Sequence, residues 1–514
     1  MVIKRIAKSN NQWYALISLI FGFILNSAFY PISFFPSVIT IGMFSIILKS
    51  IVQKRVLFLC GSFFGYGFFI IQTYWIPFAI YKTTIDIKWI VPLLSFVIPI
   101  PFALIIGLLA IITQHNKYGN VMYSINFAFL WVIFEYIRSN LLIPFPWGLL
   151  GYSSISMPFF NHTLSYVGSY GTSFFIVLLS CSLFSKNRSF IILNIMIFSC
   201  VCAIGKIKEA KYTKLNHDAI VKIRLIQPNI QQPHYGNSKE QKNILDILLK
   251  LTLLSGFHST QYIFWPEASF PYPIFQNSPW LNVLKNFIPI NNFNQSALIL
   301  GIDRIKEVSG KLLYFNSMIS LEHQNKVEYY DKRTLVPFGE YIPYKKHLTF
   351  LNKIAYSVSI DNISKGKNIN TMNLNDHMNF IPLICFESIL DPGYLSLSSH
   401  KNYQFILILS NDSWFENTTG PYQHFMIARV KAIEYGLPVI RVSNTGISAI
   451  ISPYGNIIKI APMNKQVTLD GNLPLRLKDH TLYYKVRHYI VPSIFMLYII
   501  FLITIFTLKK KRHV

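Results

Sequence analysis

Long apolar runs constrain the fold of this chain more than any other feature. Residues 12–205 are nearly continuous in apolar side chains, and residues 488–508 form another such run. A helix needs about 20 mainly apolar residues to cross the hydrocarbon core of a bilayer. The sequence therefore predicts a polytopic α-helical membrane protein, with spans near 13–29, 34–50, 56–79, 89–113, 120–138, 163–183, 188–205 and 488–508.

The composition divides the chain into three parts. The whole sequence is only 13% charged, whereas soluble proteins carry about 25% charged residues. The deficit lies in the apolar runs, because residues 206–487 have an ordinary globular composition and enough length to bury a core. We predict an N-terminal membrane domain of about seven spans (1–205), a globular domain (206–487), and a C-terminal span with a basic tail (488–514).

Basic residues in the short loops predict the orientation of the spans. They lie before the first span, between the second and third, fourth and fifth, and sixth and seventh spans, and after the last, as at Lys4, Lys54, Lys117, Lys186 and Lys509. With eight spans, all of these positions fall on one side of the membrane. The positive-inside rule makes that side the cytoplasm. We therefore expect residues 206–487 to lie outside, in a periplasm-like compartment.

The net charge of +25 has two interpretations. It can attract the protein to anionic phospholipid head groups, or it can reflect a general richness in Lys, Ile, Asn, Phe and Tyr. No Arg-Gly repeat or helix-turn-helix pattern accompanies the charge. We expect a membrane partner and no nucleic acid.

The globular part has the pattern of an α/β sandwich. Strand-like runs lie at 220–226, 262–265, 297–301, 317–321, 326–330, 380–385 and 405–409, and residues 238–254 fit an amphipathic helix. Alternation of this kind favours an α/β architecture. Catalytic groups in such folds lie past the carboxyl ends of strands. Glu267, Cys385 and the pair Asn411-Asp412 each follow a strand, and Lys332 can reach the same edge from its loop.

One cysteine stands apart from the others. Cys60, Cys181, Cys200 and Cys202 fall within predicted spans, whereas Cys385 lies in the globular part without an obvious disulfide partner. A lone thiol in a globular domain is either a core residue or a nucleophile.

The residues around Cys385 supply the roles that acyl transfer needs. A thiolate attacks a carbonyl, and the thioester that forms is readily attacked by an amine. Glu267 can take the thiol proton and return it to the leaving group. Lys332 can stabilise the oxyanion together with a backbone N–H near Phe386, and Glu340 or Glu387 can hold Lys332 in place.

Metal and cofactor signatures are missing from the sequence. His424 has no second histidine at ligand spacing, so we expect it to be an ordinary hydrogen-bonded histidine. No glycine-rich phosphate loop is present. We therefore expect neither a metal nor a cofactor.

Three motifs in the globular part resemble the Glu-Lys-Cys signature of the nitrilase (carbon-nitrogen hydrolase) superfamily. They are Trp265-Pro-Glu267, Asp331-Lys332-Arg-Thr-Leu-Val-Pro-Phe-Gly-Glu340 and Ile384-Cys385-Phe386-Glu387. The Leu-Val-Pro-Phe-Gly-Glu form, between a multi-span N-terminal half and one C-terminal span, resembles the bacterial apolipoprotein N-acyltransferases. Asn411-Asp-Ser-Trp-Phe415, Gly420-Pro-Tyr-Gln-His424 and Arg441-Val-Ser-Asn444 match that family as well, so the resemblance covers nearly the whole chain.

The resemblance implies a fold, an activity and a location. It implies an α-β-β-α nitrilase-like sandwich carried by a helical domain in the bacterial inner membrane, with the sandwich on the periplasmic side. The sn-1 acyl chain of a phospholipid would pass to Cys385 as a thioester and then to the N-terminal amine of an S-diacylglyceryl-cysteine apolipoprotein. Glu267 would be the base, Lys332 the oxyanion stabiliser and Cys385 the nucleophile, with Glu340, Phe386 and Glu387 supporting them. We expect a monomer.

The chain departs from the family pattern at two places. Glu416 stands where the family commonly has glycine, and Tyr235-Gly236 stands where a lysine and a tryptophan are expected. The alternative function is a membrane-tethered amide hydrolase that uses the same Glu267, Lys332 and Cys385. The two functions differ in the acceptor, which is water for hydrolysis and an amine for acyl transfer.

Overall fold

The computed structural model describes most of the chain and divides it into two compact units. The described residues are 11–82, 88–113, 119–141, 143–215, 221–230, 238–275, 278–290, 296–323, 326–341, 343, 363–367, 371–375, 378–390 and 402–511. Unit 1 comprises residues 1–77, 90–210 and 480–514, and unit 2 comprises residues 78–89 and 211–479.

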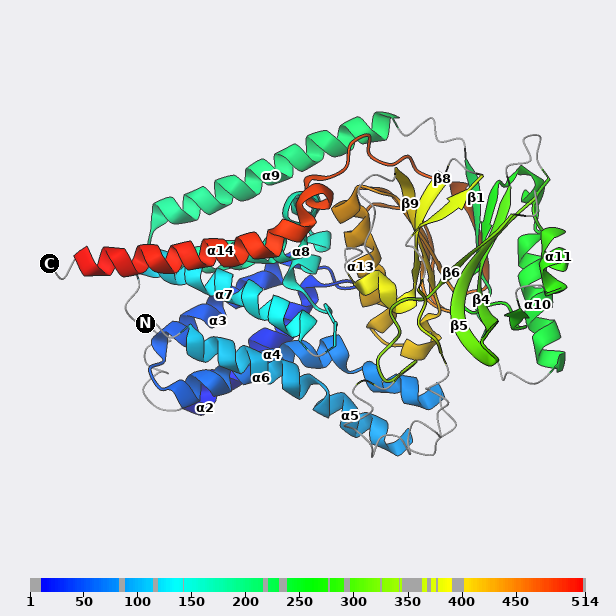
Figure 1. The fold of residues 1–514 in the computed structure, drawn as a ribbon. Coiled ribbons are helices and arrows are strands. Elements are labelled where there is room, and N and C mark those ends of the chain that lie inside the picture. The colour runs from blue at the N-terminus through cyan, green and yellow to red at the C-terminus, as the bar shows by residue number, and fades with distance from the viewer. Residues whose placement is uncertain are drawn as a thin grey trace. The chain divides into compact units, whose positions relative to one another are not determined.

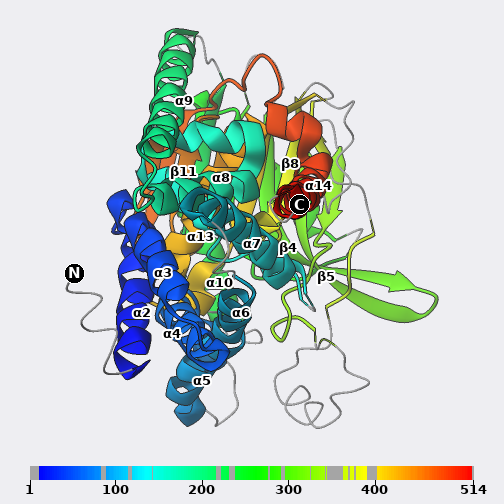
Figure 2. The ribbon, with the colours of Figure 1, turned by 90° about the vertical axis from the view of Figure 1, so that its left-hand side faces the viewer.

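Unit 1 is built of helices (Figures 1 and 2). Its longer helices are α2 (Asn11–Leu25), α3 (Ile39–Ser50), α4 (Lys54–Thr73), α5 (Val91–Val97), α6 (Pro99–Ile112), α7 (Asn120–Asn140), α8 (Leu164–Ser182), α9 (Arg188–Leu215) and α14 (Leu482–Lys511). Among the described residues, six helical segments are long and apolar enough to cross a bilayer: Lys54–Ile80, Lys88–Ile112, Asn120–Asn140, Phe160–Ser182, Arg188–Tyr212 and Leu482–Thr507. Unit 1 is therefore a helical membrane domain, as the sequence predicts.

The remaining two predicted spans are shorter helices. The predicted span 34–50 coincides with the apolar helix Phe35–Ser50, and the predicted span 13–29 coincides with α2, which has 15 residues. Helices α9 and α14 are largely uncovered by the rest of the protein. Only 11% and 6% of the residues in their most apolar 18-residue stretches are buried. Side chains such as Ile192, Met196 and Phe506 are exposed on them. A face this apolar is stable against hydrocarbon rather than water.

Unit 2 contains the strands. They are β1 (Lys222–Gln227), β2 (Tyr262–Phe264), β3 (Ile274–Phe275), β4 (Ala297–Val308), β5 (Lys311–Glu322), β6 (Val327–Asp331), β7 (Met372–Leu374), β8 (Met378–Ile384), β9 (Tyr403–Ser410), β10 (Val439–Ser443), β11 (Ser448–Ile451), β12 (Ile457–Ala461) and β13 (Val467–Asn472). Within the described residues they form two sheets, with strand orders β13-β1-β2-β4-β5-β6 and β12-β11-β10-β9-β8-β7, and β3 pairs with β4. The central pairs β1–β2, β2–β4, β8–β9 and β9–β10 are parallel.

Helices cover the outer faces of the two sheets. Figure 1 shows α10 (Ser238–Thr252) and α11 (Trp280–Lys285) beside the first sheet and α13 (Gly420–Tyr435) beside the second. Helix α10 presents Ile244, Leu248 and Leu251 to the first sheet, at the spacing of one helical face. The predicted α-β-β-α sandwich is confirmed.

The main core of unit 2 lies between the sheets. Fully buried side chains from both sheets meet there, including Phe264 of the first sheet and Phe380, Phe405 and Leu407 of the second. The rings of Phe380 and Phe405 stack at 5.0 Å, and Phe264 meets Phe405 edge-on. Each such side chain contributes about 1.5–3 kcal/mol relative to an exposed one.

The predicted strands and the helix 238–254 all appear, with some changes in length. The run predicted at 297–301 continues to Val308 as β4, and the strand predicted at 317–321 begins at Lys311 as β5. Figure 2 shows the long β4–β5 hairpin extending from its sheet. Polar residues such as Arg304 and Asn316 interrupt the apolar pattern within these strands, which is why the sequence pattern underestimates their length.

Candidate active site

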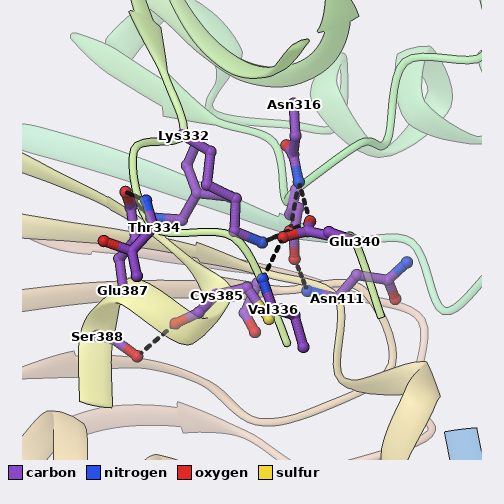
Figure 3. A network of polar contacts seen from close by, with 12 residues as sticks. Asn316, Lys332, Thr334, Val336, Glu340, Cys385, Glu387, Ser388 and Asn411 are labelled. Atoms are coloured by element: carbon purple, nitrogen blue, oxygen red, sulfur yellow. Dashed lines mark hydrogen bonds and ion pairs between the residues drawn. The ribbon is translucent and has the colours of Figure 1, made fainter. Parts of the chain in front are cut away.

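Four strands of unit 2 bring polar groups to one edge of the sandwich. Glu267 follows β2, Lys332 follows β6, Cys385 follows β8 and Asn411 follows β9. Strand β6 runs in the same direction as β2, because β5 is antiparallel to both β4 and β6 while β4 is parallel to β2. The carboxyl ends of β2 and β6 therefore lie at the same edge of the sheet. Figure 3 shows Lys332, Cys385 and Asn411 close together.

The carboxylate of Glu267 is buried and accepts three hydrogen bonds. Its Oε1 accepts from Asn316 Nδ2 at 2.8 Å and from Lys332 Nζ at 3.3 Å. Its Oε2 accepts from the backbone N–H of Asn411 at 2.7 Å. These donors come from both sheets, so the position of the carboxylate depends on how the two sheets face each other.

A glycine in β4 makes room for the turn that carries Glu267. A Cβ on Gly301 would lie 2.5 Å from the Pro266 carbonyl oxygen, 2.6 Å from Glu267 Cα and 2.7 Å from Ala268 N. All three are backbone atoms and cannot yield as a flexible side chain can. The N–H of Ser269 also donates to the Gly301 carbonyl at 3.2 Å, which holds the turn against the strand. The close approach requires glycine.

The Lys332 ammonium lies between two carboxylates. It donates to Glu340 Oε1 at 2.8 Å and to Glu267 Oε1 at 3.3 Å, and only 1% of its side chain is exposed. Burial alone would lower the pKa of Lys332, but the carboxylates of Glu340 and Glu267 outweigh burial and hold the pKa above its ordinary value. Lys332 is therefore a fixed positive charge.

Glu340 orients both the lysine and its own loop. Besides the bond from Lys332, its Oε1 accepts from Asn316 Nδ2 at 3.4 Å, and its Oε2 accepts from the Val336 N–H at 2.7 Å. The predicted support of Lys332 by Glu340 thus has a direct contact in the structure.

Glu387 has a different role from the one the sequence indicates. We expected Glu340 or Glu387 to hold the lysine side chain, and it is Glu340 that does so. The fully buried Glu387 carboxylate instead accepts from the N–H groups of Arg333 and Thr334 at 2.7 and 3.1 Å and from the Tyr330 hydroxyl at 2.9 Å. Glu387 therefore positions the backbone that carries Lys332.

Cys385 occupies a strained position at the end of β8. Its φ is +50°, which is unfavourable for a residue with a Cβ and costs about 1–3 kcal/mol. It begins the 3₁₀ helix η10 (Cys385–Ile389), in which Phe386 is the second residue. Strain of this kind persists where the surrounding structure enforces it, and here it turns the thiol out of the strand direction at the sheet edge.

The thiol of Cys385 is held in its protonated form. Burial raises its pKa most, the Glu267 carboxylate raises it further, and the Lys332 ammonium offsets part of the rise. The resting site therefore contains a thiol beside a carboxylate. A carboxylate next to a thiol is an arrangement that can perform general-base catalysis.

Sequence analysis missed Asn316. Its side-chain amide donates to Glu267 and Glu340, and its backbone carbonyl accepts from the backbone N–H of Lys332 at 2.8 Å. The one available signal was an asparagine inside an otherwise apolar strand pattern, where an amide needs a buried partner.

The two departures from the family pattern have different outcomes. Glu416 adopts φ +49°, a conformation that favours glycine, so the turn forms with strain at that position. Tyr235 and Gly236 lie outside the described residues.

Two family models match the chain along the division seen in the structure. The apolipoprotein N-acyltransferase N-terminal domain matches residues 21–182, and the carbon-nitrogen hydrolase domain matches residues 222–477.

Curated relatives match over nearly the whole length. An apolipoprotein N-acyltransferase of Rickettsia typhi is 31% identical over 503 residues, covering 95% of this chain and 98% of the relative. One of Brucella melitensis is 29% identical over 437 residues, covering 80% and 79%. Among solved structures, a CN-hydrolase superfamily protein of Xanthomonas campestris covers 54% of this chain and 96% of its own, at 13% identity and a TM-score of 0.36. The Rickettsia match spans both units at this level of identity, and the chain belongs to the apolipoprotein N-acyltransferase family.

Proposed function

We propose that this protein transfers the sn-1 acyl chain of a phospholipid, through a thioester on Cys385, to the N-terminal amine of S-diacylglyceryl-cysteine apolipoproteins. The observation that carries the proposal is the buried group of Glu267, Lys332 and Glu340 beside the strained Cys385, in a chain that also has a helical membrane domain. Membership in the apolipoprotein N-acyltransferase family supports the choice of substrates.

In the first half-reaction, Glu267 takes the proton of the Cys385 thiol as the sulfur attacks the acyl ester carbon. The oxyanion that develops is stabilised by the Lys332 ammonium and by the N–H of Phe386. The tetrahedral intermediate collapses to a thioester, and the leaving alkoxide takes the proton from Glu267. The products are acyl-Cys385 and a lysophospholipid.

In the second half-reaction, the amine of the acceptor attacks the thioester carbonyl. Glu267 accepts a proton from the amine, the same donors stabilise the oxyanion, and the Cys385 sulfur leaves and recovers the proton. The product is an amide, which is more stable than the thioester, so the second step runs forward.

We further propose that the protein lies in the inner membrane of a bacterium with unit 2 on the periplasmic side, and acts as a monomer. The basic loops between the spans support this orientation. Phospholipid is the abundant acyl donor on that side of the membrane, and the apolar exposed faces of α9 and α14 favour a lipid environment.

The test is incubation of the purified full-length protein with labelled phospholipid and no acceptor. We expect one lysophospholipid per enzyme molecule, an acyl adduct on Cys385 by intact-mass analysis, and then a halt until an S-diacylglyceryl peptide is added. Cys385→Ala is the matched control and should release nothing. Continuous release of free fatty acid by the wild-type protein would instead establish a hydrolase that uses the same residues.

A further inference from the structure

A buried polar network reaches the backbone carbonyl of Cys385. Its members are Ser388, Asp412, His424 and Arg441, and at most 2% of any of them is exposed. They come from η10, the loop after β9, helix α13 and strand β10. None of these residues has a role in the reaction described above.

Hydrogen bonds run through the network to the nucleophile. Arg441 Nη2 donates to Asp412 Oδ2 at 2.6 Å, and His424 Nδ1 lies 3.1 Å from Asp412 Oδ1. His424 Nε2 lies 2.7 Å from the Ser388 hydroxyl, and that hydroxyl donates to the backbone carbonyl of Cys385 at 2.7 Å. Figure 3 shows the last of these bonds between Ser388 and Cys385.

The protons available to Ser388 and His424 determine the direction of the hydrogen bonds that link them to Cys385. The carbonyl of Cys385 can only accept, and Ser388 has a single hydroxyl proton to give it. The hydroxyl oxygen therefore accepts from His424, which must carry a proton on Nε2. Burial, followed by the charge of Arg441, lowers the pKa of His424, whereas the Asp412 carboxylate raises it. On the other side of the ring, Nδ1 lies 3.1 Å from Asp412 Oδ1 and 3.2 Å from Arg441 Nη2.

The Asp412 carboxylate makes two further contacts besides the one between its Oδ1 and His424 Nδ1. Its Oδ1 accepts from the Ser410 hydroxyl at 2.6 Å, and its Oδ2 accepts from Arg441. Arg441 also donates from Nε to the Ile447 carbonyl at 3.1 Å. These bonds through Nε and Nη2 hold the guanidinium beside the imidazole.

The bond to the Cys385 carbonyl also determines the direction of a neighbouring donor. The peptide group that joins Cys385 to Phe386 is planar and trans, so its C=O and its N–H point in opposite directions. Holding the carbonyl toward Ser388 turns the Phe386 N–H away from Ser388. The same bond helps to keep Cys385 at its unfavourable φ of +50°.

We propose that Ser388 and His424, anchored by Asp412 and Arg441, are positioning residues for thioester formation, because they hold the Cys385–Phe386 peptide so that its N–H meets the oxyanion. This inference rests on the proposed thioester chemistry of Cys385. It assigns a function in the reaction to a histidine that the sequence shows only as an ordinary core residue.

The test measures single-turnover acylation of Cys385 in the full-length protein. The acyl donor is supplied as vesicles of labelled phosphatidylethanolamine and phosphatidylglycerol, and the adduct is followed by intact mass. We expect Ser388→Ala to lower the acylation rate at saturating lipid about 10²-fold, because a displacement of the reacting groups by about 1 Å has an effect of that size. The lipid concentration at half-maximal rate should not change.

A second buried hydroxyl provides the matched control. Ser452 accepts from the N–H groups of Tyr454 and Asn456 in the turn between β11 and β12, within the same unit. Ser452→Ala removes a comparable buried hydroxyl and should keep the wild-type rate. If Ser388→Ala and Ser452→Ala both acylate at the wild-type rate, the inference is wrong.

Variants of His424 test the network from its other end, without a change in η10. The amide of His424→Gln can donate toward Ser388 in place of Nε2, whereas His424→Leu cannot. We expect the glutamine variant to acylate at least ten-fold faster than the leucine variant, a difference of about 1.4 kcal/mol in barrier. Equal rates would overturn the inference. Absence of any adduct in the wild-type protein would instead refute the proposed function itself.

Discussion

At the scale of single residues, the site depends on three coupled charges. Lys332 is a permanent cation between Glu267 and Glu340, and Cys385 is a protonated thiol next to both signs of charge. The Glu267 carboxylate disfavours the thiolate of Cys385, yet in the proposed mechanism it is the group that accepts the thiol proton.

This coupling predicts opposite effects on the reactivity and on the catalytic function of the thiol. Glu267→Gln removes a negative charge, so the pKa of Cys385 should fall and its alkylation by iodoacetamide should rise at a lower pH than in the wild type. Lys332→Met should shift the alkylation profile to higher pH, because the Lys332 ammonium stabilises the thiolate. The profile is measured by peptide mapping, which separates Cys385 from the other cysteines.

The same Glu267→Gln variant should lose acyl transfer by about 10²–10⁴-fold, since it lacks the base. A wild-type profile with its midpoint near pH 8.5, as for an unperturbed thiol (pKa about 8.5), would contradict this account of the site. So would an active Glu267→Gln variant.

At the scale of elements, the turn after β2 is built against β4. Strand β2 has three residues and ends where Trp265 and Pro266 turn the chain, so few bonds of its own hold the turn. The bare backbone of Gly301 supplies the surface on which it rests, and the N–H groups of Ser269 and Phe270 donate to the Gly301 carbonyl. The position of Glu267, the proposed base, thus depends on Gly301 in the neighbouring strand.

Gly301→Ala should therefore damage catalysis more than it damages folding. The new Cβ meets three backbone atoms within 2.7 Å, so the turn must move and carry Glu267 with it. We expect a loss of acylation of about 10²-fold and a loss of stability of about 1–3 kcal/mol. Rates are measured by single turnover, and stability by thermal unfolding.

Gly471 in β13 offers the matched control. A Cβ there meets the flexible end of the Ile450 side chain at 2.4 Å, which can shift. Gly471→Ala should keep the wild-type acylation rate. Wild-type acylation in Gly301→Ala would show that the turn tolerates displacement.

At the scale of the whole molecule, the order of the segments determines the predicted topology. Among the described residues, seven apolar helical segments precede the strands of unit 2, and α14 follows them. An even number of spans places the two ends of the chain on one side and the inserted domain on the other. The short helices α2 and α3 are the segments on which this parity depends.

Reporter fusions at positions 215 and 514 test the predicted number of membrane crossings before each position. We expect the reporter at 215 to be active outside the cytoplasm and the reporter at 514 to be active inside it, because the basic loops alternate in that phase. A third fusion in the loop at residue 186 should agree with 514. If 215 and 514 report the same compartment, α14 does not cross the membrane. Reversed signals, inside at 215 and outside at 514, would mean that one of the first two helices does not cross.

What sequence reasoning recovers here is local in the chain. The apolar runs, the strand patterns of β1, β2, β8 and β9, and the residues that follow those strands can all be read from neighbouring side chains, because hydropathy and periodicity are properties of short windows. The assignment of Glu267, Lys332 and Cys385 as catalytic residues rests on short motifs of the same kind and stays a prediction. The full extent of β4 and β5 does not, because polar residues interrupt the pattern where tertiary contacts satisfy them.

Only the tertiary structure decides which polar groups meet. Asn316 reaches Glu267 across 49 positions of sequence, Glu387 reaches Tyr330 across 57, and Ser388 reaches His424 across 36. The sequence leaves open whether Glu340 or Glu387 holds the lysine and gives no partner for Asn316, because no short window contains both partners of such a bond. The amino-acid sequence by itself determines the membrane segments, the class of the sandwich and the residues able to do the chemistry. The geometry of these residues depends on the pairing of strands from distant parts of the chain. A buried hydrogen bond forms only where two separate backbone segments place its donor and its acceptor close together.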